Sequence, residues 1–105
     1  MIVRTFYSAV DPDDRDEVFR IFLEDVKPAY EEAPGCRGVE LLVGTHANVG
    51  GMIEGVLVSH WDTPETLQAA LASRALSEAM VRVRNLLRVE PVVGTYRVVA
   101  EDQAR

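Results

Sequence analysis

Residues that commonly bind metals or attack substrates are few in this sequence and lie apart from one another. The two histidines, His46 and His60, are distant in the chain, and no cysteines or carboxylates cluster at the spacing of a metal site. The single cysteine, Cys36, has no evident activating partner, which favours a small buried apolar role. Glycine-rich phosphate loops and G-x-S-x-G motifs are absent from the sequence. We therefore expect no metal site and no activated cysteine.

Three arginines near the end of the chain could attract an anionic substrate. Arg82, Arg84 and Arg88 fall on the last expected helix. The alternative is a solvated helix face on which Glu78 pairs with Arg82 four residues later. Because such surface pairs are common and weak, the sequence favours the solvated face.

The composition restricts the class of protein. The chain has 105 residues and a formal net charge of −6, which disfavours binding to nucleic acid. No apolar run approaches the roughly 20 residues of a membrane span, and no basic cluster would attract an anionic membrane. The N-terminus does not resemble a signal peptide, and a single cysteine forms no internal disulfide. We expect a cytoplasmic protein that binds neither nucleic acid nor membranes.

Segments rich in β-branched and aromatic residues predict four strands. The stretch from Ala47 to Gly51 is typical of a turn, so the second and third strands should form a hairpin. The expected strands cover residues 2–9, 36–46, 52–61 and 92–100.

Capping residues mark the helices between these strands. Asp11 and Pro12 begin the first helix, and Pro28 should kink or end it near Lys27. A short helix begins at Asp62 or Thr63 and runs to about Ala72. Ser73 begins the last helix, which ends by Pro91, and the first and last helices each have one apolar face. These faces contain Val18, Phe19, Phe22, Leu23 and Val26 in the first helix and Leu76, Ala79, Met80 and Val83 in the last.

The element order β-α-β-β-α-α-β predicts an α+β fold with a ferredoxin-like, four-stranded antiparallel sheet. Residues 1–100 would form one domain, followed by a frayed tail at 101–105. If Leu57, Ser59 and Trp61 point toward the helices, then Met52, Val56 and Val58 point away from them. An apolar sheet face of that extent requires a partner, so we expect a homodimer that pairs these faces.

Two segments carry a resemblance to a known family. The first is Pro34-Gly35-Cys36-Arg37-Gly38-Val39-Glu40-Leu41. The second is His60-Trp61-Asp62-Thr63-Pro64-Glu65-Thr66-Leu67. A Pro-Gly-Cys turn that opens the second strand, and a third strand that ends in Trp before a capped helix, resemble the antibiotic biosynthesis monooxygenase family over roughly residues 1–100.

The resemblance implies a dimeric α/β barrel with a pocket between sheet and helices in each subunit. Relatives oxidise phenolic, quinol-like or polyketide-like compounds with molecular oxygen and without metal or flavin, so no cofactor is expected. The resemblance places Trp61 on the pocket wall, where the indole would stack on a flat substrate and act in catalysis. A core aromatic role is the alternative. The expected pocket residues are Phe6, Phe22, Leu57, Ser59, Leu76 and Met80, and the polar candidates for orienting the substrate are Tyr7, Arg84 and Tyr96.

A sister group of the family degrades haem with an Asn on the first strand and a His on the last helix. Phe6 and Met80 stand at those positions here, and only the Trp is retained. Neither side chain performs the role of Asn or His, so haem degradation is disfavoured. The leading hypothesis is a cofactor-independent monooxygenase acting on a small aromatic molecule. A non-catalytic protein that binds a small ligand on the same fold is the alternative.

Overall fold

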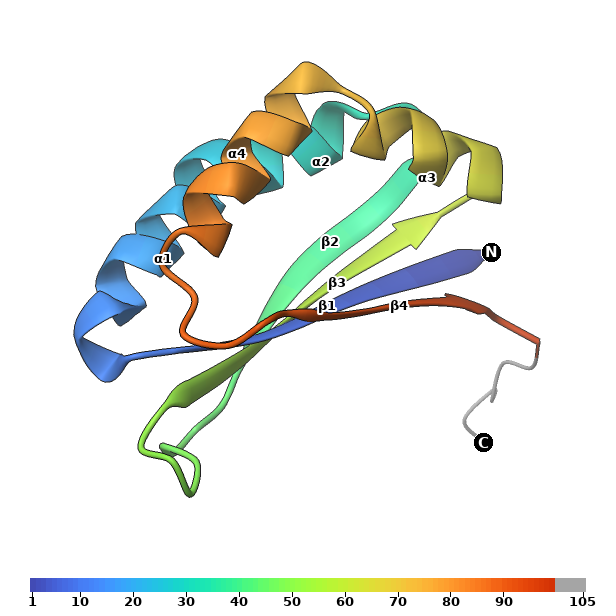
Figure 1. The fold of residues 1–105 in the computed structure, drawn as a ribbon. Coiled ribbons are helices and arrows are strands. Elements are labelled where there is room, and N and C mark those ends of the chain that lie inside the picture. The colour runs from blue at the N-terminus through green and yellow to red at the C-terminus, as the bar shows by residue number, and fades with distance from the viewer. Residues whose placement is uncertain (100–105) are drawn as a thin grey trace.

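The computed structural model describes residues 1–99 and contains one antiparallel sheet of four strands, with helices covering one face (Figure 1). The strand order is β2-β3-β1-β4, so β1 and β3 are central. This arrangement confirms the predicted α+β, ferredoxin-like fold. The predicted tail at 101–105 lies outside the described residues. The strands are β1 (Ile2–Val10), β2 (Cys36–Val43), β3 (Ile53–Trp61) and β4 (Val92–Arg97).

The hairpin between β2 and β3 forms as predicted, although β2 ends earlier than expected. The side-chain oxygen of Asn48 accepts hydrogen bonds from the backbone N–H groups of Gly50 and Met52, at 2.9 and 3.0 Å. This Asn-centred turn occupies residues that would otherwise extend the strands. The loop therefore starts after Val43.

The first helical region continues past Pro28 to Glu32. Just before the proline, the backbone forms a π turn in which the N–H of Lys27 bonds the carbonyl of Phe22. A wider turn accommodates a proline because it replaces the regular hydrogen-bond pattern that proline would interrupt. The extra turn buries Tyr30 among the core residues. The successive segments are η1 (Pro12–Asp14), α1 (Arg15–Ile21), η2 (Phe22–Val26) and α2 (Lys27–Glu32).

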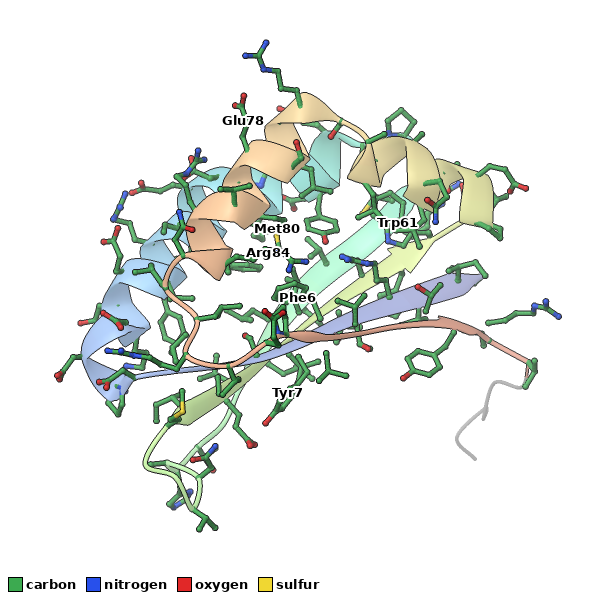
Figure 2. All side chains as sticks on the ribbon, viewed as in Figure 1. Phe6, Tyr7, Trp61, Glu78, Met80 and Arg84 are labelled. Atoms are coloured by element: carbon green, nitrogen blue, oxygen red, sulfur yellow. The ribbon has the colours of Figure 1, made fainter. Side chains whose placement is uncertain are left out.

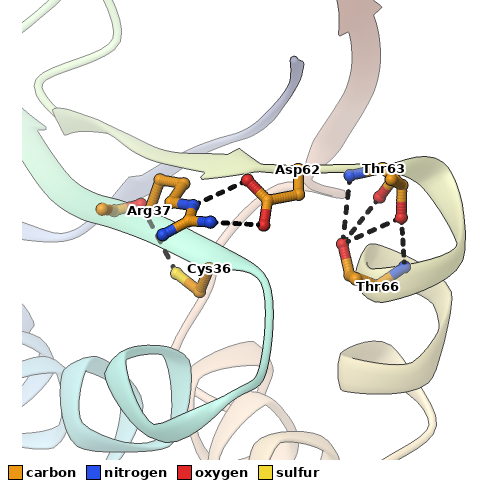
Figure 3. A network of polar contacts seen from close by, with 6 residues as sticks. Cys36, Arg37, Asp62, Thr63 and Thr66 are labelled. Carbon is orange, nitrogen blue, oxygen red and sulfur yellow. Dashed lines mark hydrogen bonds and ion pairs between the residues drawn. The ribbon is translucent and has the colours of Figure 1, made fainter.

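The two later helices begin at the predicted caps. Thr63 caps α3 (Pro64–Leu71), and its hydroxyl and backbone exchange hydrogen bonds with Thr66 (Figure 3). Ser73 caps α4 (Arg74–Arg84). This last helix ends well before Pro91, because the chain tightens into turns in which Leu86 and Leu87 bond carbonyls three residues earlier.

A surface ion pair joins the start of β2 to the end of β3. The guanidinium of Arg37 contacts both carboxylate oxygens of Asp62, at 2.6 and 2.8 Å (Figure 3). This contact lowers the pKa of Asp62, chiefly through the hydrogen bond from Arg37. The pair therefore holds the Pro-Gly-Cys turn beside the loop that leads into α3.

The register divides the sheet into an inner face toward the helices and an outer face away from them. Phe6 opposes Leu57 and Ile2 opposes Trp61 on the inner face, where all four are buried. The outer face carries Val3, Thr5, Tyr7, Glu40, Leu42, Glu54, Val56, Val58, His60, Val92 and Tyr96. Among residues 1–99, no helix combines the length and apolar character that a membrane span requires.

Candidate functional site

Trp61 lies at the end of β3 in the core and is 0% exposed. Its indole N–H donates to the hydroxyl of Ser59 at 2.9 Å. Its ring packs at a tilt of 53° against Tyr30, with 5.9 Å between ring centroids. In this conformation the indole offers neither a free face nor a free N–H to a ligand, and Ser59 is engaged with it.

Four of the predicted pocket residues come together between β1, β3 and α4. Phe6, Phe22, Leu57 and Met80 surround a cavity of about 30 Å³. That space holds only one or two water molecules. The predicted apolar pocket is therefore nearly filled by its own side chains.

A second hollow, of about 270 Å³, shares Met80 with this cavity. It combines apolar side chains from α3 and α4 with two guanidinium groups, one from β1 and one from α4. Figure 2 shows Phe6, Met80 and Arg84 in the space between α4 and the sheet. Met80 lines both spaces. We call this second space the arginine hollow; it is lined by Arg4, Leu71, Leu76, Ser77, Met80, Val81 and Arg84.

Arg4 is the feature of the site that the sequence interpretation missed. It points to the inner face between Ile2 and Phe6 and is 8% exposed. One of its terminal nitrogens donates to the hydroxyl of Tyr30 at 3.1 Å. The alternation of side chains along β1 was the available signal, since a residue two positions from both Ile2 and Phe6 must share their face.

Tyr30 was missed because the first helix was predicted to kink or end near Lys27. Burial raises the pKa of the Tyr30 phenol, and this effect outweighs the opposing influence of the nearby Arg4 charge. Tyr30 is therefore a neutral hydroxyl at physiological pH. It accepts the hydrogen bond that holds Arg4 beside the hollow.

The three arginines near the chain end differ in their partners. Arg82 pairs with Asp25 at 3.2 Å, and Arg88 lies 3.8 Å from both Asp11 and Asp14. The expected pair of Glu78 with Arg82 is wrong, because Glu78 instead bonds Arg74 at 2.8 Å. Arg84 forms no ion pair with any carboxylate of residues 1–99. It lies 5.4 Å from the centre of the Phe6 ring.

The two tyrosine candidates lie on the outer face, away from the hollow. Figure 2 shows Tyr7 on the side of the sheet opposite Phe6 and Met80. Its hydroxyl donates to Glu54 at 2.6 Å, and this hydrogen bond is the main cause of its raised pKa. Tyr96 pairs with Val3 on the same outer face and is exposed. Neither phenol can reach a molecule in the arginine hollow of its own subunit.

The histidines and the cysteine also lie apart from the hollow. His60 is on the outer face, and His46 is exposed in the hairpin loop. Burial raises the pKa of the Cys36 thiol, which disfavours the reactive thiolate. Within residues 1–99, no group of three His, Cys, Asp or Glu side chains is placed to hold a metal ion.

A larger hollow of about 440 Å³ lies at the surface among α2, α3 and the start of α4. Its lining consists mainly of alanines, with Glu32 and Glu65 as the only charged residues among them. No buried charged group faces it. The arginine hollow is smaller but is the one that brings a buried cation together with apolar walls.

Known proteins share both the sequence pattern and the fold of this chain. A sequence profile described as antibiotic biosynthesis monooxygenase matches residues 1–91. The chain belongs to the antibiotic biosynthesis monooxygenase family. Comparison with curated proteins finds no significant match.

Solved structures of similar fold cover nearly all of this family member. A crystal structure of an antibiotic biosynthesis monooxygenase has a TM-score of 0.78 at 18% identity, covering 95% of this chain and 100% of the other. Rv0793 from Mycobacterium tuberculosis has a TM-score of 0.75 at 19% identity, covering 97% and 98%. A mutant of SnoaB, a cofactor-independent oxygenase from Streptomyces nogalater, has a TM-score of 0.72 at 15% identity, covering 95% of each chain. At these identities the likeness establishes the fold.

Proposed function

We propose that this protein is a monooxygenase that oxidises a small aromatic, quinol or polyketide-like compound with molecular oxygen, without metal or flavin. Membership of the family and the fold shared with the cofactor-independent oxygenase SnoaB support this proposal. The observation that carries it is the arginine hollow, in which apolar walls meet the guanidinium of Arg4. Such a space suits a flat apolar molecule that becomes negatively charged during reaction.

The electrons for oxygen reduction come from the substrate itself. An anthrone loses a proton from its methylene carbon, and the resulting enolate carbon forms a bond with O₂ to give a hydroperoxide. Loss of the second hydrogen from that carbon as a proton, with cleavage of the O–O bond, leaves a carbonyl and one water. One anthrone and one O₂ thus give one anthraquinone and one H₂O. The protein must favour the enolate, which fixed positive charge does.

Met80 is the side chain that determines how much space the substrate has. It lines both the 270 Å³ hollow and the 30 Å³ cavity beside Phe6, Phe22 and Leu57. Small-molecule sites span roughly 300–1,000 Å³, so the hollow lies just below the usual range. Methionine is unbranched and flexible, and its rotation would join the two spaces. Phe6, Phe22, Leu57, Leu76 and Met80 would then surround the substrate rings.

We propose a supporting role for Trp61 and Ser59. Trp61 packs on Tyr30, and Tyr30 accepts the hydrogen bond from Arg4. The indole therefore influences the substrate only indirectly, by holding Tyr30 and, through it, Arg4. This makes Trp61 a positioning residue. Ser59 fixes the indole by accepting its N–H.

The outer face supports the proposal that the protein is a homodimer. Leu42, Val92 and Tyr96 are 51%, 64% and 59% exposed, and Val56 and Val58 lie between them on the central strand. Apolar side chains of this number on one sheet face are typical of a protein–protein contact. A second copy would cover them face to face.

A non-catalytic binding protein is the second candidate, and one observation favours it. None of the residues that line the arginine hollow is a carboxylate, imidazole or thiol. A general base for removing the substrate proton is therefore missing from the lining. A protein of this second kind would bind an aromatic ligand in the hollow and release it without chemical change.

Oxygen consumption with an anthrone tests the proposal. We expect the wild-type protein to consume one O₂ per anthraquinone formed and to release no hydrogen peroxide, because spontaneous autoxidation yields peroxide whereas the proposed step yields water. Oxygen uptake no faster than in protein-free buffer would contradict the oxygenase and favour the binding protein.

A matched pair of variants locates the reaction. Ser77 is exposed at the rim of the arginine hollow, so Ser77→Trp fills the entrance without disturbing the core. Glu78 points away from the sheet on the same helix, so Glu78→Trp adds equal bulk elsewhere (Figure 2). We expect Ser77→Trp to lower oxygen uptake at least about tenfold, while Glu78→Trp retains it. Equal activity in both variants would place the reaction elsewhere.

A further inference from the structure

Arg4 is a buried cation whose charge no residue of the described chain neutralises. None of the ion pairs among residues 1–99 includes Arg4. Its one side-chain partner is the neutral hydroxyl of Tyr30. Buried charges in proteins are normally paired, so an unpaired one at a cavity indicates a missing anion.

The hydrogen-bonding capacity of Arg4 points in the same direction. A guanidinium has five N–H donors in a fixed planar fork. Among residues 1–99, only the hydrogen bond to Tyr30 uses one of these donors. No buried side-chain nitrogen in that range is both inaccessible to solvent and without a hydrogen-bond partner. The remaining donors of Arg4 are therefore open to the arginine hollow that it lines.

Arg84 adds a second positive charge at the mouth of the same hollow. It is exposed and lies 5.4 Å from the Phe6 ring centre, while Arg4 lies 6.0 Å from that centre. Arg82 and Arg88, its neighbours in the chain, each lie beside an aspartate, whereas Arg84 does not among residues 1–99. In a chain of net charge −6, this hollow is lined by two arginines and by no carboxylate.

We infer that the arginine hollow binds an aromatic compound that carries a negatively charged oxygen group. Arg4 holds the anionic oxygens at the floor, and Arg84 closes on the ligand at the mouth. Leu71, Leu76 and Met80 supply the apolar contact for the ring. This inference rests on the proposed function, because it names the class of substrate that the same site takes. It also assigns Arg4 and Arg84 as residues that bind the substrate.

Calorimetric titration with three naphthalene probes tests the inference. 2-Naphthoate carries a permanent carboxylate, its methyl ester is neutral, and 2-naphthol becomes anionic only when its phenolate is stabilised. We expect the wild type to bind 2-naphthoate about 10- to 100-fold more tightly than the methyl ester, the range for hydrogen bonds to charged groups. Binding of 2-naphthol as its phenolate, seen in its absorption spectrum at neutral pH, would extend the site to ionised phenols. Binding of naphthoate alone would restrict it to carboxylates.

Charge-removing variants assign the effect to the two arginines. Arg4→Gln and Arg84→Gln should each remove most of the preference for 2-naphthoate and leave affinity for the ester within about twofold. Arg74→Gln removes the same charge from the exposed start of α4 and should change neither affinity. If Arg4→Gln fails to fold, as judged by circular dichroism, the affinities of Arg84→Gln, at the exposed mouth, test the inference on their own. Equal affinity of the wild type for acid and ester, or no binding of either, would overturn the inference.

The same measurements separate this inference from the proposed function. Tight binding of 2-naphthoate without oxygen uptake from any anthrone would retain the anion site and reject the oxygenase. Anthrone oxidation by a wild type that binds 2-naphthoate no more tightly than its methyl ester would retain the oxygenase and reject the anion site.

Discussion

Each face of the sheet carries a few side chains that are unusual for its surroundings. The inner face is buried, yet it contains the guanidinium of Arg4 and the hydroxyl of Ser59. The outer face has no cover within the described chain, yet it exposes Leu42 and Val92. A buried charge and exposed large apolar side chains both lower the stability of an isolated chain, so stability alone does not explain either placement.

The difference separates two kinds of interaction that this fold provides. On the inner face no described residue neutralises the buried charge of Arg4, and we infer that a small anionic ligand pairs with it. On the outer face the exposed apolar residues would be covered by a surface of matching shape, and we propose that a second copy supplies it. Substitutions that alter one face at a time test this division, and they are ordered here from the largest expected effect to the smallest.

Removal of the indole should cause the largest loss of stability. Trp61→Ala leaves a cavity where a fully buried indole packs on the inner face, and we expect the free energy of unfolding to fall by about 3–5 kcal/mol. Val92→Ala on the outer face should lower it by about 0.5 kcal/mol or less at a concentration where the chain is monomeric. Urea unfolding measures both. Similar losses in the two variants would remove the distinction between the faces.

A charge at the centre of the outer face should disrupt the proposed dimer. Val58→Glu would bury an unpaired carboxylate between two subunits, and we expect the dimer dissociation constant to rise at least about 100-fold. Leu23→Glu, at an exposed position on η2, is the matched control and should leave the dimer intact. Sedimentation velocity distinguishes the outcomes. A wild-type protein that is monomeric at micromolar concentration would contradict the dimer.

The paired replacement of Arg4 and Tyr30 tests whether the buried charge serves stability. Arg4→Met with Tyr30→Phe removes both hydrogen-bond partners and keeps most of the volume. Because an uncompensated charge is expensive to bury, we expect the free energy of unfolding to stay unchanged or to rise by about 1–2 kcal/mol. Thermal and urea unfolding provide the measurement. A loss above about 2 kcal/mol would show that Arg4 is a structural residue.

The smallest effect concerns the hydrogen bond from Tyr7 to Glu54 on the outer face. The hydrogen bond from Tyr7 is the main cause of the lowered pKa of Glu54. Its contribution to folding stability is therefore present above the ordinary glutamate pKa of 4.5 and is lost as pH falls through the lower pKa of the folded state. The bond to Glu54 raises the pKa of Tyr7 above 10.0, so the contribution is also lost as pH rises through that higher value.

We therefore expect Tyr7→Phe to be less stable than the wild type at neutral pH, with the difference shrinking at both extremes. Urea unfolding at several pH values measures this profile. Tyr96→Phe, on the same face, removes a phenol that has no hydrogen bond to a carboxylate among residues 1–99 and is the matched control. A difference between Tyr7→Phe and the wild type that is constant with pH would indicate that the hydrogen bond contributes nothing.

The sequence was sufficient for those parts of the structure that depend on local chemistry. Asp11, Thr63 and Ser73 cap the segments that they were expected to cap. Alternation along β3 placed Leu57, Ser59 and Trp61 on one face. The same rule applied to β1 would have put Arg4 beside Phe6 and excluded Tyr7.

Contacts between distant segments were beyond prediction. The π turn before Pro28 carries Tyr30 into the core, whereas the proline itself left open whether the helix would kink or end near Lys27. Arg84 differs from Arg82 and Arg88 only because Asp25, Asp11 and Asp14 lie near those two in space. Which arginine stays unpaired is therefore decided by the tertiary fold.

The central claim is that a negative oxygen group on an aromatic ring binds Arg4 in the space between α4 and β1. A crystal structure of the protein with 2-naphthoate tests it most directly. We expect carboxylate oxygens about 2.7–2.9 Å from the Arg4 guanidinium nitrogens, with the naphthalene ring against Met80. Naphthoate bound elsewhere, with Arg4 paired to a carboxylate of the protein itself, would contradict the account.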